Sequence, residues 1–125
     1  MALSDRLKEY KKCLKTFREV LSIPENEFIR DSAIKRFELC FELGWKTLKD
    51  FLTEEGIICR SPKSCLKEAF SMGLIDDEDE WLSILEDRNL SVHTYKEELA
   101  KDIYKRLKNH HKAMERLLEK LEERI

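Results

Sequence analysis

Hydrophobic residues near the N-terminus recur every three or four positions, which is the repeat of one face of an amphipathic helix. The positions between them are mostly lysine, glutamate and other polar residues. Pro24 follows this segment, and because the residue before a proline is disfavoured in helical geometry, we expect the first helix to end near 22–23. Its apolar stripe consists of Leu3, Leu7, Tyr10, Leu14, Phe17 and Leu21.

A second helix is expected from about Glu25 to Glu55, with Gly56 as a typical residue directly after its end. This helix carries apolar residues on more than one side, which predicts either a central position in the fold or an oligomer interface on one face. Its main stripe is Ile34, Phe37, Phe41, Trp45, Leu48 and Leu52, and this stripe is widened by Leu39, Cys40, Leu43 and Phe51.

Three further helices are expected in the second half of the chain. Ser61 and Pro62 suit the cap and first position of a short helix that ends at Gly73. The acidic run 76–80 is typical of a helix start, where the helix dipole favours negative charge. The last helix matches the first in length and spacing, so the two should pack along each other. Its stripe is Leu99, Ile103, Leu107, His110, Met114, Leu117 and Leu121, which makes His110 a core residue.

Composition supports the same fold class. Only three of the 125 residues are glycine and two are proline, valine is scarce, and 40% of the residues are charged. Such a chain favours helices with exposed charged faces. We therefore predict an all-α protein with a single domain over residues 1–125, arranged as an up-and-down four-helix bundle with one additional short helix.

The charge is small overall but uneven. A net charge of −2 argues against a protein that coats nucleic acid with its whole surface. Residues 30–67 carry eight Lys or Arg against six Asp or Glu, residues 76–98 carry two against nine, and residues 99–125 carry eight against five. We therefore expect any polyanion to bind locally, on the second and last helices.

The cysteines at positions 13, 40, 59 and 65 lack the C-x-x-C spacing of zinc sites, so no metal site and no cofactor are expected. The N-terminus lacks the apolar segment of a signal peptide, and no apolar run approaches the ~18 residues that span a bilayer. We expect a reduced cytoplasmic protein with free, mostly buried thiols and no membrane contact.

The stretch 88–95 holds the candidate chemistry. If the fourth helix is continuous, Arg88 lies on an apolar stripe, and a buried arginine requires a carboxylate or a bound anion. Glu38 of the second helix is the candidate partner, because Glu42 is well placed to pair with Lys46 one turn later. An arginine that merely reaches solvent or a structural ion pair remains an alternative. The stripe is Trp81, Leu85, Arg88, Val92 and Tyr95.

A helix break is expected within this stretch. Thr94 and Glu97 have the spacing of a capping box, which implies that the last helix starts there and that the chain bends near 91–93. Such a bend would let His93 approach Arg88.

An arginine and a histidine together suit cleavage of RNA without a metal. Histidine exchanges protons near neutral pH, and arginine binds a phosphate and stabilises the charge that develops on it. The nucleophile is the ribose 2′-hydroxyl, which only RNA carries. We expect His93 and Arg88 to be catalytic, with Asn89 assisting by hydrogen bonding. Because one histidine cannot readily serve as base and acid at once, a symmetric dimer of two sites suits this chemistry.

These residues resemble a known family. The pattern Arg-x4-His-x-Tyr, here Arg88, His93 and Tyr95, is similar to the motif of HEPN-domain proteins. More narrowly, the chain resembles their nucleotidyltransferase substrate-binding subfamily, the HepT-type partners of minimal nucleotidyltransferases. The segments that carry the likeness are 37–38, 42–49, 61–63, 73–75, Trp81, 88–89 and 93–95.

The resemblance implies a helical bundle that forms a homodimer with the two motifs along a cleft. It implies a metal-independent ribonuclease toxin whose antitoxin, a minimal nucleotidyltransferase, transfers AMP to Tyr95. It also leaves open a non-catalytic role, as the substrate-binding subunit of a two-component nucleotidyltransferase. A purely structural helical protein is a third alternative.

Overall fold

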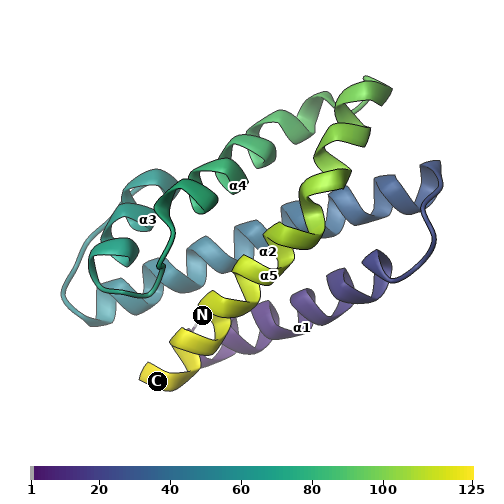
Figure 1. Ribbon diagram of the computed structural model, residues 1–125. Helices are drawn as coiled ribbons and strands as arrows, with labels where there is room; N and C mark the ends of the chain where they lie inside the picture. Colours follow the sequence, from purple (N-terminus) through teal and green to yellow (C-terminus); the bar gives the residue numbers. More distant parts are fainter. Residues whose placement is uncertain (1) are drawn as a thin grey trace.

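The computed structural model describes residues 2–125, which are almost entirely helical (Figure 1). No strand occurs among these residues, so the predicted all-α class is confirmed, and so are four main helices with one short helix between them. In chain order the elements are α1 (Leu3–Leu21), α2 (Glu27–Glu54), α3 (Pro62–Ser71), α4 (Glu78–Leu90), the 3-10 turn η1 (Ser91–His93) and α5 (Glu97–Arg124).

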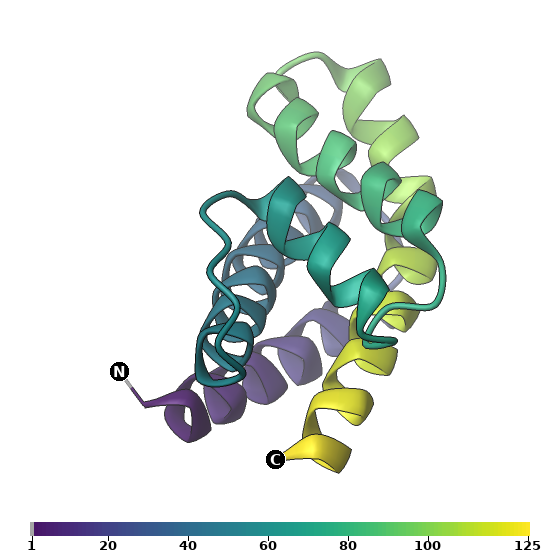
Figure 2. The same ribbon diagram turned by 90° about the vertical axis from the view of Figure 1, so that its left-hand side faces the viewer.

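Helix α2 is the centre of the bundle, as its apolar character on more than one side predicted. It contacts α1, α3, α4 and α5. Figure 2 shows the short α3 lying between the C-terminal half of α2 and the start of α4. The site residues on α4 are therefore held against a helix that is itself buried on several sides.

Helices α1 and α5 pack along each other in antiparallel orientation, which confirms the expectation from their matching patterns. Lys11 lies 3.3 Å from Glu122, whereas Arg18, seven residues later, lies 4.0 Å from Glu115, seven residues earlier. The buried Tyr10 hydroxyl donates a hydrogen bond of 2.7 Å to the carbonyl oxygen of Met114. This bond ties the two ends of the chain together inside the core.

One glycine permits the close approach of α1 to α2. Gly44 is buried in the middle of α2, and a Cβ atom added there would lie 3.0 Å from the ring of Tyr10. A larger residue at this position would push the two helices apart in a closely packed core.

The helix starts follow the expected capping chemistry in two cases. The Ser61 hydroxyl accepts the backbone N–H of Ser64, and Pro62 is the first helical residue of α3. Helix α4 begins after Asp77, whose carboxylate accepts the N–H of Glu80 at 3.0 Å. Helix α2 starts two residues later than expected, because the Asn26 side chain caps it by accepting the N–H of Ile29.

The prediction of four free thiols is wrong. Cys59 and Cys65 form a disulfide that joins the segment after α2 to α3, with their Cα atoms 5.1 Å apart. That separation is typical of disulfides, and the turn of the chain before α3 produces it, which the spacing of six residues did not reveal. Cys13 and Cys40 remain free, with their sulfur atoms 3.0 Å apart. None of the helices described is both long and apolar enough to cross a membrane.

Candidate functional site

The segment 88–95 connects α4 to α5, and the helix is interrupted there as expected. Helix α4 ends at Leu90, and the single turn η1 precedes α5. The capping box at Thr94 and Glu97 is wrong, because the first helical residue of α5 follows Lys96 and that cap has no side-chain hydrogen bond. The Thr94 hydroxyl instead donates to the carbonyl oxygen of Ser91 at 3.0 Å, which closes η1.

Arg88 is half-buried and paired with a carboxylate of α2. Its guanidinium forms a hydrogen-bonded ion pair with Glu42, and its Cζ atom lies 5.7 Å from the ring centre of Phe41. A guanidinium over an aromatic face is attracted by the electrons of the ring. Both interactions fix the arginine side chain against α2.

The expected partner of Arg88 was Glu38, and that prediction is wrong. Helices α2 and α4 are antiparallel here, so Arg88 meets Glu42, whereas Ser91, one turn further along the chain, meets Glu38. The Ser91 hydroxyl lies 3.0 Å from Glu38 Oε2 and 2.6 Å from the Arg88 carbonyl oxygen. Glu38 therefore supports the bend after α4 and does not neutralise the arginine.

Glu42 interacts with two cations. Its Oε1 atom binds Arg88, and Oε2 lies 3.9 Å from Lys46 Nζ, which is the i,i+4 pair expected from the sequence. The indole N–H of Trp45 also points at Oε2, at 3.4 Å. This carboxylate is thus the electrostatic link between α2 and the candidate catalytic arginine.

His93 and Tyr95 lie on the surface beside each other. Their ring centres are 6.0 Å apart in an edge-on arrangement, and Tyr95 is 78% exposed. Among residues 2–125 no hydrogen bond or ion pair joins His93 to Arg88, so the bend does not bring the two into contact within one chain. Asn89 is exposed, and its side-chain oxygen accepts a weak hydrogen bond of 3.4 Å from Arg88.

Two surface hollows flank this segment. A hollow of about 500 Å³ is lined by His93 and Asn89, with apolar walls from Leu85 and Leu90. A second hollow of about 290 Å³ contains Tyr95 and the buried Arg30, which is itself bound to Glu25 at 3.0 Å. The histidine and the tyrosine therefore face different spaces, which suits different roles for the two residues.

A buried ionic cluster next to Arg88 was not foreseen. Asp87 is only 3% exposed and accepts two hydrogen bonds of 2.8 Å from Arg106, on α5. The His110 Nε2 atom lies 2.7 Å from the same carboxylate, and because an ionised carboxylate only accepts, this nitrogen carries the proton. Burial by itself raises the pKa of Asp87, but the hydrogen bonds from Arg106 and His110 outweigh it and hold that pKa below its ordinary value.

His110 is buried, as its place in the apolar seam predicted, but it is a hydrogen-bonded member of this cluster and not a purely apolar contact. The available signal was the helical spacing of Arg106 and His110 on α5, one turn apart, which places both on one face. Within residues 2–125 there is no group of three or more His, Cys, Asp or Glu side chains arranged to hold a metal ion.

Comparison with known proteins agrees with the helical fold. The family described as "Nucleotidyltransferase substrate binding protein like" matches residues 5–123. The chain belongs to this family. The match extends from the first turn of α1 to the last turn of α5 and includes the whole segment 88–95.

Three relatives are similar to this chain, and their names point to different functions or to none. A Haemophilus influenzae protein named "Probable ribonuclease HepT" is 33% identical over 97 residues. The match covers 74% of this chain and 66% of that protein, just under two thirds of its length. A crystal structure of a Thermus thermophilus protein has a TM-score of 0.85 at 38% identity and covers 90% of this chain and 98% of its own.

A second solved structure, also from Haemophilus influenzae, has a TM-score of 0.73 at 25% identity, with 96% of each chain covered. It is described as revealing the fold of a substrate binding domain of a nucleotidyltransferase. The names of the relatives thus include both a ribonuclease and a substrate-binding domain, and both are compatible with the HEPN and HepT resemblance.

Proposed function

We propose that this family member is a HepT-type toxin, a metal-independent endoribonuclease that is controlled by a minimal nucleotidyltransferase. The observation that carries the proposal is the exposed His93 at the bend after α4, five residues beyond Arg88, in a chain 33% identical to a protein named as a probable ribonuclease. The proposal includes a single domain and a cytoplasmic location, where RNA is present.

In this mechanism His93 removes the proton of a ribose 2′-hydroxyl, and the resulting oxygen attacks the adjacent phosphorus. The bond from phosphorus to the 5′-oxygen breaks, so the products are a 2′,3′-cyclic phosphate and a 5′-hydroxyl end. Arg88 stabilises the negative charge on the phosphoryl oxygens as the new bond forms. Asn89 supplies a hydrogen bond to the same phosphate.

The leaving 5′-oxygen requires a proton, and each chain has one histidine at the site. We therefore include a homodimer in which His93 of the partner subunit supplies that proton. Exposed apolar residues near the site support an interface there: Val92 is 68% exposed, and Leu39, on the adjoining face of α2, is 37% exposed. The separation of Arg88 from His93 within one chain also favours a site completed by a second copy.

The proposed nucleotidyltransferase partner acts on Tyr95. Its phenolic oxygen attacks the α-phosphorus of ATP, pyrophosphate leaves, and AMP remains attached through a phosphodiester bond. Tyr95 is 78% exposed and lies beside His93, so a bulky anionic group there hinders RNA access.

A non-catalytic substrate-binding subunit is the second candidate. One observation favours it: Arg88 is already paired with Glu42, so a phosphate at Arg88 has to compete with that carboxylate. The description of the Haemophilus influenzae structure as a substrate binding domain is in line with this role. Under this alternative the chain binds a nucleotidyltransferase and presents its substrate, and no RNA is cut.

An RNA cleavage assay separates the two candidates. The purified wild type, His93→Ala and Tyr95→Phe proteins are incubated with a labelled oligoribonucleotide in the presence of a chelator. Because general acid–base catalysis contributes roughly 10²–10⁴-fold, we expect His93→Ala to cut at least about 100-fold more slowly and Tyr95→Phe to cut like wild type. Equal rates for wild type and His93→Ala, or no cutting by either, would rule out the ribonuclease and leave the binding subunit.

A further inference from the structure

A row of basic side chains follows α1 on a surface that none of the site residues reaches. Lys8, Lys11, Lys15 and Arg18 are spaced by three, four and three residues, so they share one face of the helix. At a rise of 1.5 Å per residue this row is about 15 Å long. Together with Lys12 these residues line a hollow of about 410 Å³ between α1 and α5. Of the row, Lys11 is paired with Glu122 at 3.3 Å.

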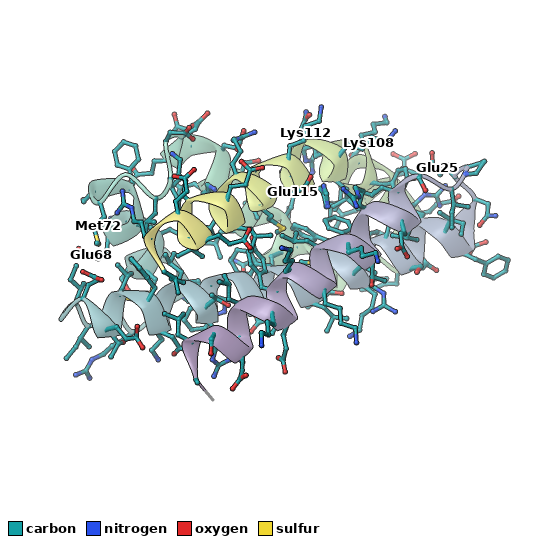
Figure 3. The ribbon with its side chains drawn as sticks, turned by 90° about the horizontal axis from the view of Figure 1, so that it is seen from below. Glu25, Glu68, Met72, Lys108, Lys112 and Glu115 are labelled. Carbon is teal, nitrogen blue, oxygen red and sulfur yellow. A yellow bond between two sulfur atoms is a disulfide. The ribbon has the colours of Figure 1, made fainter. Side chains whose placement is uncertain are left out.

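A second hollow continues the first along the same pair of helices. It has a volume of about 320 Å³, shares Arg18 with the first, and adds Lys108 and Lys112 of α5. Figure 3 looks onto this side of the molecule, where α1 and α5 face the reader and Lys108 and Lys112 are labelled along α5. We call the two hollows together the α1/α5 groove.

The charge of the α1/α5 groove is strongly one-sided. Five basic residues line the first hollow and two more line the second, against a single acidic residue, Glu115. The charge of Glu115 is already engaged, since its carboxylate lies 3.0 Å from His111 Nδ1 and 4.0 Å from Arg18. Lys15, Lys108 and Lys112 are exposed and form no ion pair among residues 2–125.

We propose that the α1/α5 groove binds the sugar–phosphate backbone of RNA, outside the Arg88 and His93 site. A regular line of cations on one helix matches a linear polyanion with evenly spaced charges. The walls are aliphatic: they consist of Leu14, Leu118 and the lysine side-chain stems. No Phe, Tyr or Trp lines either hollow, so the groove binds phosphates and does not select bases.

This groove also accounts for how an acidic protein holds RNA. The sequence predicted local positive charge on the second and last helices. In the structure α5 packs against both α1 and α2, and the basic hollows lie between α5 and α1. The acidic residues 76–80 are at the start of α4, which is not part of the groove. The choice of RNA as the polyanion rests on the proposed ribonuclease function, but binding by the groove does not require cleavage.

The test measures binding of a fluorescent oligoribonucleotide by anisotropy at several salt concentrations, in a His93→Ala background that leaves the RNA uncut. The groove variant is Lys15→Gln/Lys108→Gln/Lys112→Gln. The matched variant removes the same charge elsewhere, by Lys35→Gln/Arg60→Gln/Lys67→Gln, and all six side chains are exposed. Thermal melting of each variant checks that the fold is retained.

We expect the groove variant to bind at least about tenfold more weakly near 0.1 M salt, with a salt slope smaller by about 2, because each lost phosphate contact on a single strand contributes ~0.7 to the slope. The matched variant should bind almost as well as the His93→Ala protein. Equal losses in both triple variants, unchanged binding by the groove variant, or no binding of RNA by the His93→Ala protein would each overturn the proposal.

Cleavage by the wild type is measured separately. If the groove variant loses RNA binding but the wild type cuts nothing, the groove stands and the ribonuclease function falls. If the groove variant keeps its RNA affinity but no longer associates with the nucleotidyltransferase, the groove is a protein interface and the proposal for RNA is overturned.

Discussion

Glu42 and Arg88 form an ion pair that connects the centre of α2 to the last turn of α4. Each side chain is about one-third exposed, at 34% and 35%. Partly exposed ion pairs contribute little to stability, about 0–1 kcal/mol. The Glu42–Arg88 pair should affect phosphate binding more than stability, because a phosphate that reaches Arg88 must compete with the Glu42 carboxylate.

Glu42→Gln should therefore lower the KM for an oligoribonucleotide severalfold, since about 1 kcal/mol corresponds to a factor of roughly five. The free energy of unfolding should fall by less than about 1 kcal/mol. Steady-state cleavage and urea denaturation measure the two quantities. Glu54→Gln, an exposed change at the far end of α2, serves as the control. A fall in kcat with an unchanged KM would contradict this prediction and would make Glu42 a positioning residue for Arg88.

The cluster of the buried Asp87 and His110 with the partly exposed Arg106 should dominate stability at the α4–α5 contact. Removing the charge of one member of a buried pair leaves its partners uncompensated, so Asp87→Asn should cost about 3 kcal/mol at neutral pH. The exposed Asp31→Asn should change the free energy of unfolding by less than about 0.5 kcal/mol.

The same cluster predicts how stability depends on pH. The pKa of Asp87 is lower in the folded protein than its ordinary 3.8, so the unfolded chain takes up the proton first as pH falls. The contribution of Asp87 is thus fully present above pH ~4 and is lost as pH decreases through the folded pKa. The difference between wild type and Asp87→Asn in urea denaturation should shrink below pH 4, and a constant difference down to pH 2 would contradict the role of this charge.

Much of the fold could be predicted because the helices are amphipathic and their ends carry local signals. The stripe of α1 and the Ser61–Pro62 start of α3 depend only on neighbouring residues, and both predictions are confirmed. The predicted start of α5 was wrong because one side chain could form either of two local hydrogen bonds. Thr94 has the sequence of a helix cap, yet its hydroxyl closes η1, so α5 starts later.

The partners within the site could not be predicted because they depend on the register between helices. Glu38 and Glu42 lie one turn apart on α2, and a shift of one turn along α4 decides which of them meets Arg88. The role of Asp87 could not be predicted for the same reason. Its neighbours in sequence do not indicate burial, and its partners Arg106 and His110 are on α5, which packs against it only in the folded chain.

The disulfide between Cys59 and Cys65 should stabilise the segment before α3 to a limited extent. It closes a loop with a sequence separation of only six residues, so the loss of unfolded-state entropy corresponds to about 2 kcal/mol. We expect dithiothreitol to lower the free energy of unfolding of wild type by about that amount. The Cys59→Ala/Cys65→Ala variant should show no response to the reductant. An equal response in both proteins would contradict the prediction, because it would not come from the Cys59–Cys65 bond.

Tyr95 should be the acceptor of AMP, and tyrosine variants can test this. Incubating the chain with its nucleotidyltransferase and ATP should add one AMP to wild type, detected as a shift in intact mass, and should stop RNA cleavage. Tyr95→Phe should gain no AMP and should remain active in the presence of the partner, because the phenylalanine ring keeps the contact with His93 but lacks the nucleophilic oxygen. Tyr104→Phe is the matched control, since Tyr104 is half-buried on α5, and it should be modified like wild type. Modification of Tyr95→Phe to the same extent as wild type would place the acceptor elsewhere and remove the proposed control of the site.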